Sequence, residues 1–332
     1  MNVLLLGGGV FLGRHLIDVL LERGHAVTTY TRGVRAVPGG DAVTRLTGDR
    51  EGALDDLRAD GWDAVVDTSG YLPRFVRASA QRLAGAGRYA FVSSVSVYDE
   101  THPAPDESAP VQGIPPDLDP EMGSVDGRSY GPYKAACEAA VRETFGDRAL
   151  IVRPGLIVGP NDPTDRFTYW PERFLSEGDV LAPAPAQRGV QFVDVRDVAA
   201  FTVRALEDGR GGNVNVTSPP DAVTMGEVVY GSRAASESEA DVAWVDEAFL
   251  EREGVEPWTG LPLWLPESLG LPGLTNANVD RALAWGMALR PLAATIADTL
   301  AWVRTLPRDR ERKAGITAER EAELLRAWRA AT

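Results

Sequence analysis

A tyrosine and a lysine four residues apart form the strongest chemical signal in this chain of 332 residues. Pro132, which lies between Tyr130 and Lys134, is typical of the first turn of a helix, so both side chains are expected on one helical face. A phenol ordinarily titrates at about pH 10, but a neighbouring ammonium group and the positive end of a helix both favour phenolate. The pair therefore predicts a general acid/base, Tyr130, assisted by Lys134.

A serine at the end of an apolar run is the third candidate catalytic residue. Ser94 follows the run Ala90 to Val92, and a strand there would place its hydroxyl group near the substrate oxygen that Tyr130 protonates or deprotonates. Without the tyrosine and the lysine, Ser93 and Ser94 would be an ordinary strand end. Together the three residues predict proton transfer at a carbonyl or alcohol oxygen.

A glycine-rich turn lies between the apolar run Val3 to Leu6 and a segment with helical periodicity. A strand, turn and helix in this order predict a site for a dinucleotide pyrophosphate, because free N–H groups at the start of the helix face the ligand. The glycines follow G-x-G-x-x-x-G, so Val10 adds a side chain where backbone would approach the phosphate groups most closely. The predicted cofactor contacts here are Gly7, Gly9, Val10, Phe11, Leu12 and Gly13.

The end of the second predicted strand bears on the choice between NADP and NAD. It lacks the Asp or Glu that would hold the 2′-hydroxyl group of the adenosine ribose, and Arg32 would attract a 2′-phosphate group. The sequence therefore favours NADP, with NAD as the alternative and an ordinary exposed arginine as the simplest explanation. Asp49 is placed to accept from the adenine amino group, although an ordinary turn aspartate would fit as well. Arg50, beside it, is predicted as a further cofactor contact.

Alternating apolar runs and amphipathic stretches are expected to position these residues. We predict an α/β fold, a Rossmann-type doubly wound parallel sheet with a smaller C-terminal substrate-binding part. The predicted strands are Val3 to Leu6, Ala26 to Tyr30, Val43 to Leu46, Ala64 to Asp67, Tyr89 to Val92, Ile151 to Val158, Val190 to Val195 and Asn213 to Val216. The predicted helices run from Leu12 to Leu20, ending before Gly24, from Arg74 to Leu83, and from Thr317, as its cap, to Ala330.

The expected domains follow from these elements. Residues 1–158 with about 190–217 would bind the dinucleotide, residues 159–189 with 218–303 would bind the substrate, and residues 304–332 would form a helical tail. The segment Asp99 to Gly127 holds eight acidic residues, six prolines and no Lys or Arg. Such a long aperiodic segment in a compact domain is typical of a functional or mobile loop, with a solvated excursion as the alternative.

Composition restricts the partners. The 34 Lys and Arg against 48 Asp and Glu give a net charge of −14, which repels phosphate backbones and anionic lipid, so we expect neither nucleic acid nor membrane as a partner. No export or membrane segment is predicted, and the single Cys137 fits a reducing compartment, so a cytoplasmic location is expected. The three histidines share no ligand spacing, and no metal is predicted.

Taken in order, the motifs of this chain resemble the extended, atypical branch of the short-chain dehydrogenase/reductase family, of the NAD-dependent epimerase/dehydratase type, over about residues 1–300. The resemblance rests on residues 7–13, 48–50, 91–98, 130 with 134, 153–160 and 191–199. It implies that Tyr130 is the catalytic acid/base, that Lys134 lowers its pKa and holds the nicotinamide ribose, and that Ser94 orients the substrate oxygen. Further cofactor contacts are expected at Ser69, Ser93, Pro154, Gly155 and Ile157.

Three departures from the family pattern restrict the expected chemistry. Val10 replaces the middle glycine of the turn. Leu156 stands where sugar-nucleotide enzymes of this type usually have an Asn that contacts the substrate diphosphate. Val95 and Ser96 follow Ser94 where the dehydratases carry an Asp-Glu pair. Dehydration of a sugar nucleotide is therefore disfavoured, and its epimerisation is weakened as a hypothesis.

Three functions remain in competition. The leading hypothesis is NADP(H)-dependent hydride transfer at a carbonyl or alcohol group of a small molecule that is not strongly anionic. The alternative is an epimerase of the sugar-nucleotide type with tightly held NAD, and the third is a non-catalytic dinucleotide-sensing or RNA-associated protein. A homodimer through the helix of Lys134 and the helix Arg74 to Leu83 is expected by analogy. Candidate substrate contacts are Tyr71, Arg166, Tyr169, Trp170 and Gln191.

Overall fold

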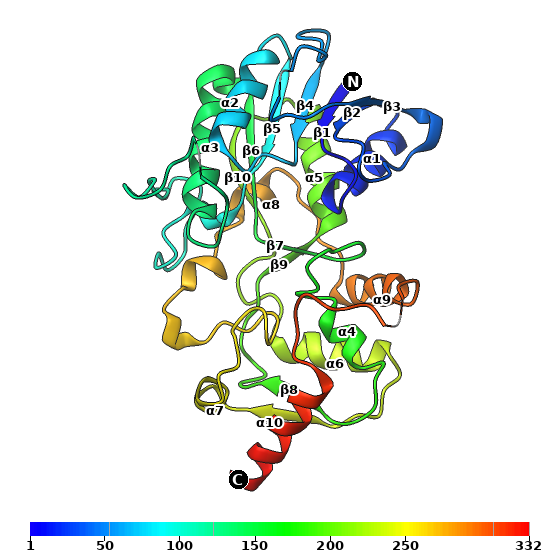
Figure 1. Cartoon of the computed structure of the whole chain (residues 1–332), viewed down its shortest axis with the longest axis vertical. Helices are drawn as coiled ribbons and strands as arrows, with labels where there is room; N and C mark the ends of the chain where they lie inside the picture. The colour runs from blue at the N-terminus through cyan, green and yellow to red at the C-terminus, as the bar shows by residue number, and fades with distance from the viewer. Residues whose placement is uncertain (53, 122, 308, 332) are drawn as a thin grey trace. The chain divides into compact units, whose positions relative to one another are not determined.

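Seven parallel strands form a central sheet in the computed structural model, which describes residues 1–52, 54–121, 123–307 and 309–331 (Figure 1). The strand order is β10-β6-β5-β4-β1-β2-β3. The strands β1 to β3 follow one another toward one edge of the sheet, and β4, β5, β6 and β10 follow one another toward the other edge, so the order reverses between β1 and β4. This order confirms the predicted doubly wound α/β fold. The strands are β1 (Asn2–Leu6), β2 (Ala26–Thr31), β3 (Val43–Thr47), β4 (Ala64–Asp67), β5 (Arg88–Val92), β6 (Ala149–Pro154) and β10 (Gly212–Val216).

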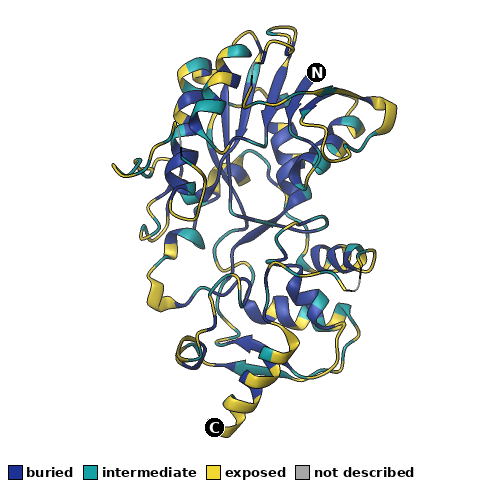
Figure 2. Ribbon diagram, in the orientation of Figure 1, coloured by how far each residue is buried: buried dark blue, intermediate teal, exposed yellow. Residues whose placement is uncertain are grey.

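Helices cover both faces of this sheet. Figure 1 shows α1 (Leu12–Glu22) beside α5 (Val195–Glu207) on one face and α2 (Pro73–Arg82) beside α3 (Tyr130–Phe145) on the other. With both faces covered, the inner strands β1, β4, β5 and β6 are almost wholly buried (Figure 2), which is why they read as apolar runs in the sequence. Gly24 follows α1 with a φ of 75°, as the predicted end of that helix requires.

The chain divides into two compact units. The first comprises Met1–Leu156, Val195–Thr217 and Pro272–Ala288, and the second comprises Ile157–Asp194, Ser218–Leu271 and Leu289–Thr332. The first unit also holds η1 (Gly40–Ala42), η2 (Val95–Val97), η3 (Gly146–Arg148), η5 (Pro272–Leu274) and α8 (Asp280–Ala284).

The second unit combines short strands with helices. Strand β8 (Val180–Pro183) pairs in parallel with β11 (Val242–Val245), and β7 (Leu156–Val158), which begins at the boundary, pairs with β9 (Phe192–Asp194). The other elements are α4 (Tyr169–Arg173), α6 (Met225–Ala235), α7 (Glu247–Arg252), η4 (Glu267–Leu269), α9 (Leu292–Val303) and α10 (Ala318–Ala331). Thr317 caps α10 as predicted, since its hydroxyl oxygen accepts from the N–H of Arg320.

The unit boundaries differ from the expected domains at two places. Residues 272–288, expected in the substrate-binding part, pack in the first unit because Ala277 is buried in one apolar cluster with Val97 and Tyr98. Residues 304–332, expected as a separate tail, belong to the second unit because the buried Glu321 of α10 accepts hydrogen bonds from Arg173 and from the N–H of Leu181.

Two predicted strands are shorter in the structure. The run Ile151 to Val158 is split at Gly155: β6 ends at Pro154, and β7 begins at Leu156 in a different sheet. The run Val190 to Val195 contributes only β9, because Val195 already belongs to α5. Within the described ranges, no helix is long and apolar enough to cross a membrane.

Candidate active site

The start of α3 carries the predicted acid/base pair. The helix begins at Tyr130, whose N–H donates to the carbonyl group of Asp126, and Pro132 occupies the first turn as predicted. Gly131 packs directly against η2, since a Cβ atom there would lie 2.2 Å from the carbonyl oxygen of Ser96. Only glycine fits this contact, which holds the first turn of α3 against the segment that follows Ser94.

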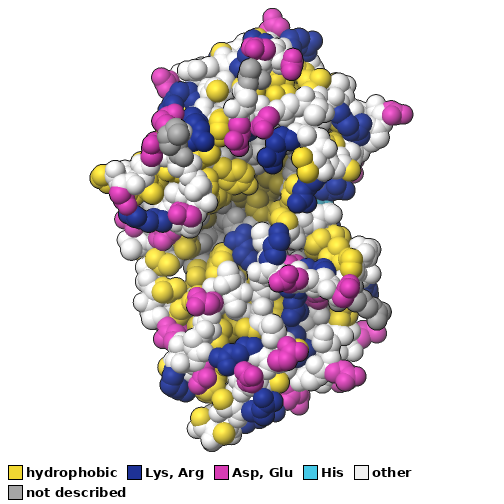
Figure 3. All heavy atoms as spheres, viewed as in Figure 1, with side chains coloured by type: hydrophobic (Ala, Val, Ile, Leu, Met, Phe, Trp, Pro, Cys, Tyr) yellow, Lys and Arg dark blue, Asp and Glu magenta, His cyan; other side chains and the backbone are white. Residues whose placement is uncertain are grey.

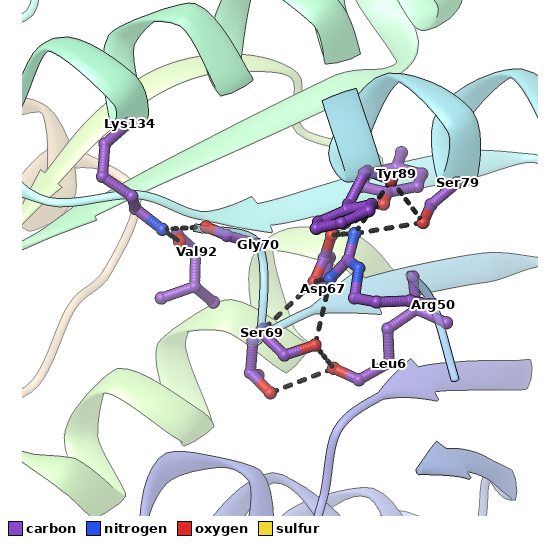
Figure 4. A network of polar contacts seen from close by, with 11 residues as sticks. Leu6, Arg50, Asp67, Ser69, Gly70, Ser79, Tyr89, Val92 and Lys134 are labelled. Carbon is purple, nitrogen blue, oxygen red and sulfur yellow. Dashed lines mark hydrogen bonds and ion pairs between the residues drawn. The ribbon is translucent and has the colours of Figure 1, made fainter. Parts of the chain in front are cut away.

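Lys134 is buried at the carboxyl ends of two strands. Its Nζ donates to the carbonyl oxygens of Gly70, at 2.9 Å, and Val92, at 2.6 Å (Figure 4). The ammonium group also lies 4.4 Å from the ring centroid of Phe91 and 5.4 Å from that of Tyr71. Burial lowers the pKa of Lys134 to about 8, which keeps most of its charge at neutral pH.

An ammonium group has three N–H donors, and the described part of the chain accepts from two of those on Lys134. The third donor is available to a ligand hydroxyl group, as the role implied for Lys134 toward the nicotinamide ribose requires. Lys134 therefore fits the dinucleotide from its hydrogen-bond geometry as well as from its place in the motif.

Ser94 lies at the end of β5 and is 8% exposed. Its Oγ accepts from the N–H of Ser96, which caps η2, and it is 3.1 Å from the hydroxyl oxygen of Ser96. The local structure thus fixes the side chain while leaving a small accessible surface. A substrate oxygen would compete with Ser96 for the Ser94 hydroxyl proton.

The turn after β1 fits a pyrophosphate group. Gly7 and Gly8 have φ angles of 118° and 115°, which a residue with a side chain rarely adopts. Gly13 allows α1 to approach the turn, since a Cβ atom there would lie 2.7 Å from the amide nitrogen of Gly8. The N–H groups of Val10 and Leu12 have no acceptor within the described ranges, so they can donate to a ligand anion.

The position of this turn agrees with the topology. Because the strand order reverses between β1 and β4, their carboxyl ends form the crevice in which open parallel sheets bind ligands. Gly7 and Ser69 follow these two strands, and the side chain of Val10 is 42% exposed rather than packed into the protein. The residues present therefore fit a dinucleotide at this edge of the sheet.

Arg50 has a different role from the predicted cofactor contact. Its guanidinium group donates to both carboxylate oxygens of the fully buried Asp67, at 2.7 and 2.9 Å, and to the hydroxyl groups of Ser69 and Ser79 (Figure 4). Burial alone would raise the pKa of Asp67, but the charge and hydrogen bonds of Arg50 hold that pKa below its ordinary value. Arg50 thus anchors the segment after β3 to the sheet.

The remaining cofactor candidates are distributed around this edge. Arg32 and Asp49 are exposed, and the carboxylate of Asp49 accepts only from the nearby N–H of Glu51 within the described part of the chain. The hydroxyl group of Ser93 is directed into the protein, where it donates to Glu138. The strand-end positions, Pro154 in β6, Gly155 directly after it and Ile157 in β7, follow the order expected from the sequence.

Two predicted substrate contacts are core residues instead. Tyr169 and Trp170 are both fully buried in the second unit, and the Nε1 of Trp170 donates to the carbonyl group of Pro262. Gln191 is 4% exposed and donates to the carbonyl group of Ser218. Aromatic side chains after a strand can form either a pocket wall or a core, and the spacing alone does not distinguish these outcomes.

The other two substrate candidates are more accessible. Tyr71 is 50% exposed and lies beside Lys134, in the same unit as Tyr130 and Ser94. Arg166 is partly buried in the second unit, with its guanidinium group 5.6 Å from the ring centroid of Trp258. Of the five candidates, the structure brings Tyr71 next to Lys134.

The acidic segment 99–127 is attached to the first unit by specific contacts. The side chain of Gln112 donates to the carbonyl oxygens of Ser96 and Tyr98, and Tyr98 forms a β-bridge with Val111. Glu107 is 8% exposed and accepts from the N–H of Asn215. Met122 lies outside the described residues. The described part of this segment is therefore packed against η2 and β10 through several polar contacts.

No group of His, Cys, Asp and Glu residues suited to a metal ion occurs within the described ranges. Glu138, which is fully buried on α3 one turn after Lys134, was not among the predicted site residues. A glutamate at the same helical spacing as Tyr130 and Lys134 was the available signal, since three polar residues four apart share one face of a helix.

Solved structures of similar fold include NAD-dependent epimerases. UDP-glucuronic acid 4-epimerase from Bacillus cereus in complex with NAD is 16% identical, with a TM-score of 0.63 over 92% of this chain and 99% of that chain. UDP-N-acetylglucosamine 4-epimerase from Bacillus cereus is 16% identical, with a TM-score of 0.66 over 93% and 99%. WbmH from Bordetella bronchiseptica in complex with NAD+ is 18% identical, with a TM-score of 0.65 over 92% and 98%. These similarities establish the fold.

A curated relative is the chloroplast stem-loop binding protein of 41 kDa b of Arabidopsis thaliana, which is 27% identical over 223 residues. The match covers 62% of this chain and 55% of the relative. A model of the NAD dependent epimerase/dehydratase family matches residues 74–217, the segment that contains Ser94, Tyr130 and Lys134. This match confirms the resemblance drawn from the sequence over residues 74–217.

Proposed function

We propose that this protein is an oxidoreductase of the epimerase type, which holds NAD tightly and inverts a hydroxyl-bearing carbon of a small molecule. The observation that carries the proposal is the position of Lys134, which lies four residues after Tyr130 with its ammonium group fixed at the carboxyl ends of β4 and β5. The family match and the fold shared with NAD-dependent epimerases favour this function over the NADP(H)-dependent reductase favoured by the sequence alone.

Tyr130 would move the proton in both halves of the reaction. Its phenolate oxygen takes the proton of the substrate hydroxyl group as the carbon is oxidised, and returns it when the opposite face of the carbonyl carbon is reduced. Lys134 stabilises the phenolate by its charge, and Ser94 donates a hydrogen bond to the reacting oxygen. When bound, NAD supplies the hydride acceptor and donor, so the cycle consumes no external oxidant.

The NADP(H)-dependent reductase is the second candidate, and one observation favours it. Arg32 is exposed just after β2, and no carboxylate occupies that strand end, so a 2′-phosphate group would meet a positive charge. The proposed substrate in either case is neutral or cationic, because Leu156 replaces the expected diphosphate-binding Asn and because the segment 99–127 is acidic.

An RNA-associated function is the third hypothesis, and the name of the Arabidopsis relative bears on it. The net charge of −14 disfavours such a partner. On the face drawn in Figure 3, acidic and basic side chains are interspersed over the described residues of each unit, which also disfavours a partner with a phosphate backbone. We also propose that the enzyme is cytoplasmic and that it forms a homodimer through α2 and α3, which pack side by side.

The nucleotide that the purified protein retains distinguishes these functions. Heat denaturation should release about one equivalent of NAD per chain if the protein is an epimerase with tightly held cofactor. An empty site that takes up NADPH in solution would favour the reductase instead. Absence of binding to either dinucleotide would contradict both enzymatic proposals.

A further inference from the structure

Glu138 is a buried carboxylate with four hydrogen bonds. Its side chain is fully buried, and Oε1 accepts from Ser93 Oγ at 2.6 Å and from Arg153 Nε at 2.8 Å. Oε2 accepts from one nitrogen of Arg153 and one of Arg142, both at 2.6 Å. Arg153 is itself 1% exposed. A carboxylate so fully satisfied holds each of its partners in one geometry, because leaving any of these groups unpaired in the interior is costly.

Three consecutive residues at the end of β5 connect to the catalytic groups. The carbonyl oxygen of Val92 accepts from Lys134, the hydroxyl group of Ser93 donates to Glu138, and Ser94 is the candidate catalytic serine. Lys134 and Glu138 are four residues apart on α3, on the helical face that begins with Tyr130. The Ser93–Glu138 hydrogen bond therefore fixes the register between the helix that carries Tyr130 and the strand that carries Ser94.

Hydrogen bonds also connect Arg153 to the edge strand β10. Arg153 Nη1 donates to the hydroxyl oxygen of Tyr98 at 2.7 Å, and that hydroxyl group donates to the side chain of Asn215 at 2.7 Å. Asn215 in turn donates through its N–H to the carboxylate of Glu107 at 2.9 Å. The chain of hydrogen bonds thus joins α3 to β6, β10 and the acidic segment, so that Glu138 is held in place from both sides.

We propose that Glu138 is a positioning residue, which acts through Ser93 and Arg153 to hold Tyr130 and Lys134 in register with Ser94. This inference rests on the proposed function, in which Tyr130 is the acid/base. Glu138 does not face the substrate in this arrangement, and its effect on the reaction is indirect. The negative charge of Glu138 also opposes, as one of several neighbouring charges, the lowering of the Lys134 pKa that burial causes.

The test is the ultraviolet titration of tyrosinate, which needs no knowledge of the substrate. The difference at each pH between a protein and the same protein with Tyr130→Phe gives the titration of Tyr130 alone. Burial raises the pKa of five other tyrosines, which moves their titrations away from that of Tyr130. These are Tyr30, Tyr71, Tyr89, Tyr98 and Tyr169.

Three variants separate positioning from simple stability. Ser93→Ala removes the hydrogen bond to Glu138 without changing any charge and should raise the Tyr130 midpoint by about one pH unit. Glu138→Gln should raise it by less, because the loss of a carboxylate charge by itself favours the phenolate. Ser93→Thr keeps the hydroxyl group and should restore the parent midpoint. Glu143→Gln, a change at an exposed glutamate of the same helix, is the matched control and should leave the midpoint unchanged.

The outcomes distinguish this inference from the proposed function. If Tyr130 of the parent protein titrates at or above the ordinary phenol value, the proposed function fails. Suppose that Tyr130 of the parent protein titrates below the ordinary phenol value. If the folded Ser93→Ala variant then has the same Tyr130 midpoint as the parent protein, Glu138 has only a structural role and the inference is wrong. Should Glu138→Gln not fold, the comparison of Ser93→Ala with Ser93→Thr still decides between these results.

Discussion

Both units contain buried charged side chains, but only those of the first unit lie beside the candidate site. In the first unit, buried charged groups surround the residues predicted to do chemistry: Arg50 pairs with Asp67 beside Ser69, and Lys134 lies between two strand ends. In the second unit, buried charged pairs such as Arg173 with Glu321 attach the C-terminal helix. Buried charge thus marks the candidate site only where it meets the carboxyl ends of the parallel strands.

The largest effect should come from the acid/base itself. Tyr130→Phe removes the proton-transferring group and should lower turnover of any active substrate roughly 10²- to 10⁴-fold. Tyr133→Phe is the matched control on the same helix, because its hydroxyl group donates to the backbone carbonyl oxygen of Asp119 and not to a residue of the candidate site. Steady-state rates of the two variants provide the comparison, and equal losses in both would remove Tyr130 from its assigned role.

The buried pair of the first unit should dominate stability. Arg50→Met leaves the fully buried Asp67 without its counter-charge and should lower the free energy of unfolding by about 3–5 kcal/mol. Arg32→Met, at an exposed position after β2, should change it by less than about 0.5 kcal/mol. Urea denaturation measures both. A similar small effect at both positions would show that the Arg50–Asp67 pair does not anchor this edge of the sheet.

The buried lysine should produce a characteristic pH dependence. The pKa of Lys134 is lowered from an ordinary value of 10.5 to about 8, so between these pH values the unfolded chain binds more protons than the folded one. Stability relative to Lys134→Met should therefore rise with pH in this window, by about 3 kcal/mol in all. Denaturation curves of both proteins at pH 7.5 and 10 check the sign, and a relative fall would contradict the depressed pKa.

The smallest effect is expected in the second unit. The hydroxyl group of Tyr169 is buried and has no hydrogen-bond partner within the described ranges, so Tyr169→Phe should leave stability unchanged or raise it by about 1 kcal/mol. Turnover and substrate affinity should stay at the parent level. A large rise in the Michaelis constant would instead restore Tyr169 as a substrate contact.

The contrast between the units also explains which features the sequence could predict. Tyr130 and Lys134 were identifiable because helical spacing fixes their common face, and the inner strands of the sheet were identifiable as buried apolar runs. The burial of Tyr169 and Trp170 could not be predicted, because an aromatic residue after a strand carries no sign of whether tertiary packing will bury it. The ion pair of Arg50 could not be predicted for a related reason, since its partner Asp67 lies 17 residues away and meets it only in the folded sheet.

The most direct test of the central claim is the titration of Tyr130 in the parent protein and in Lys134→Met. The account predicts a midpoint clearly below about 10 in the parent protein, because the ammonium group of Lys134 stabilises the phenolate, and a higher midpoint once that charge is removed. Identical midpoints at or above the ordinary phenol value in both proteins would contradict it.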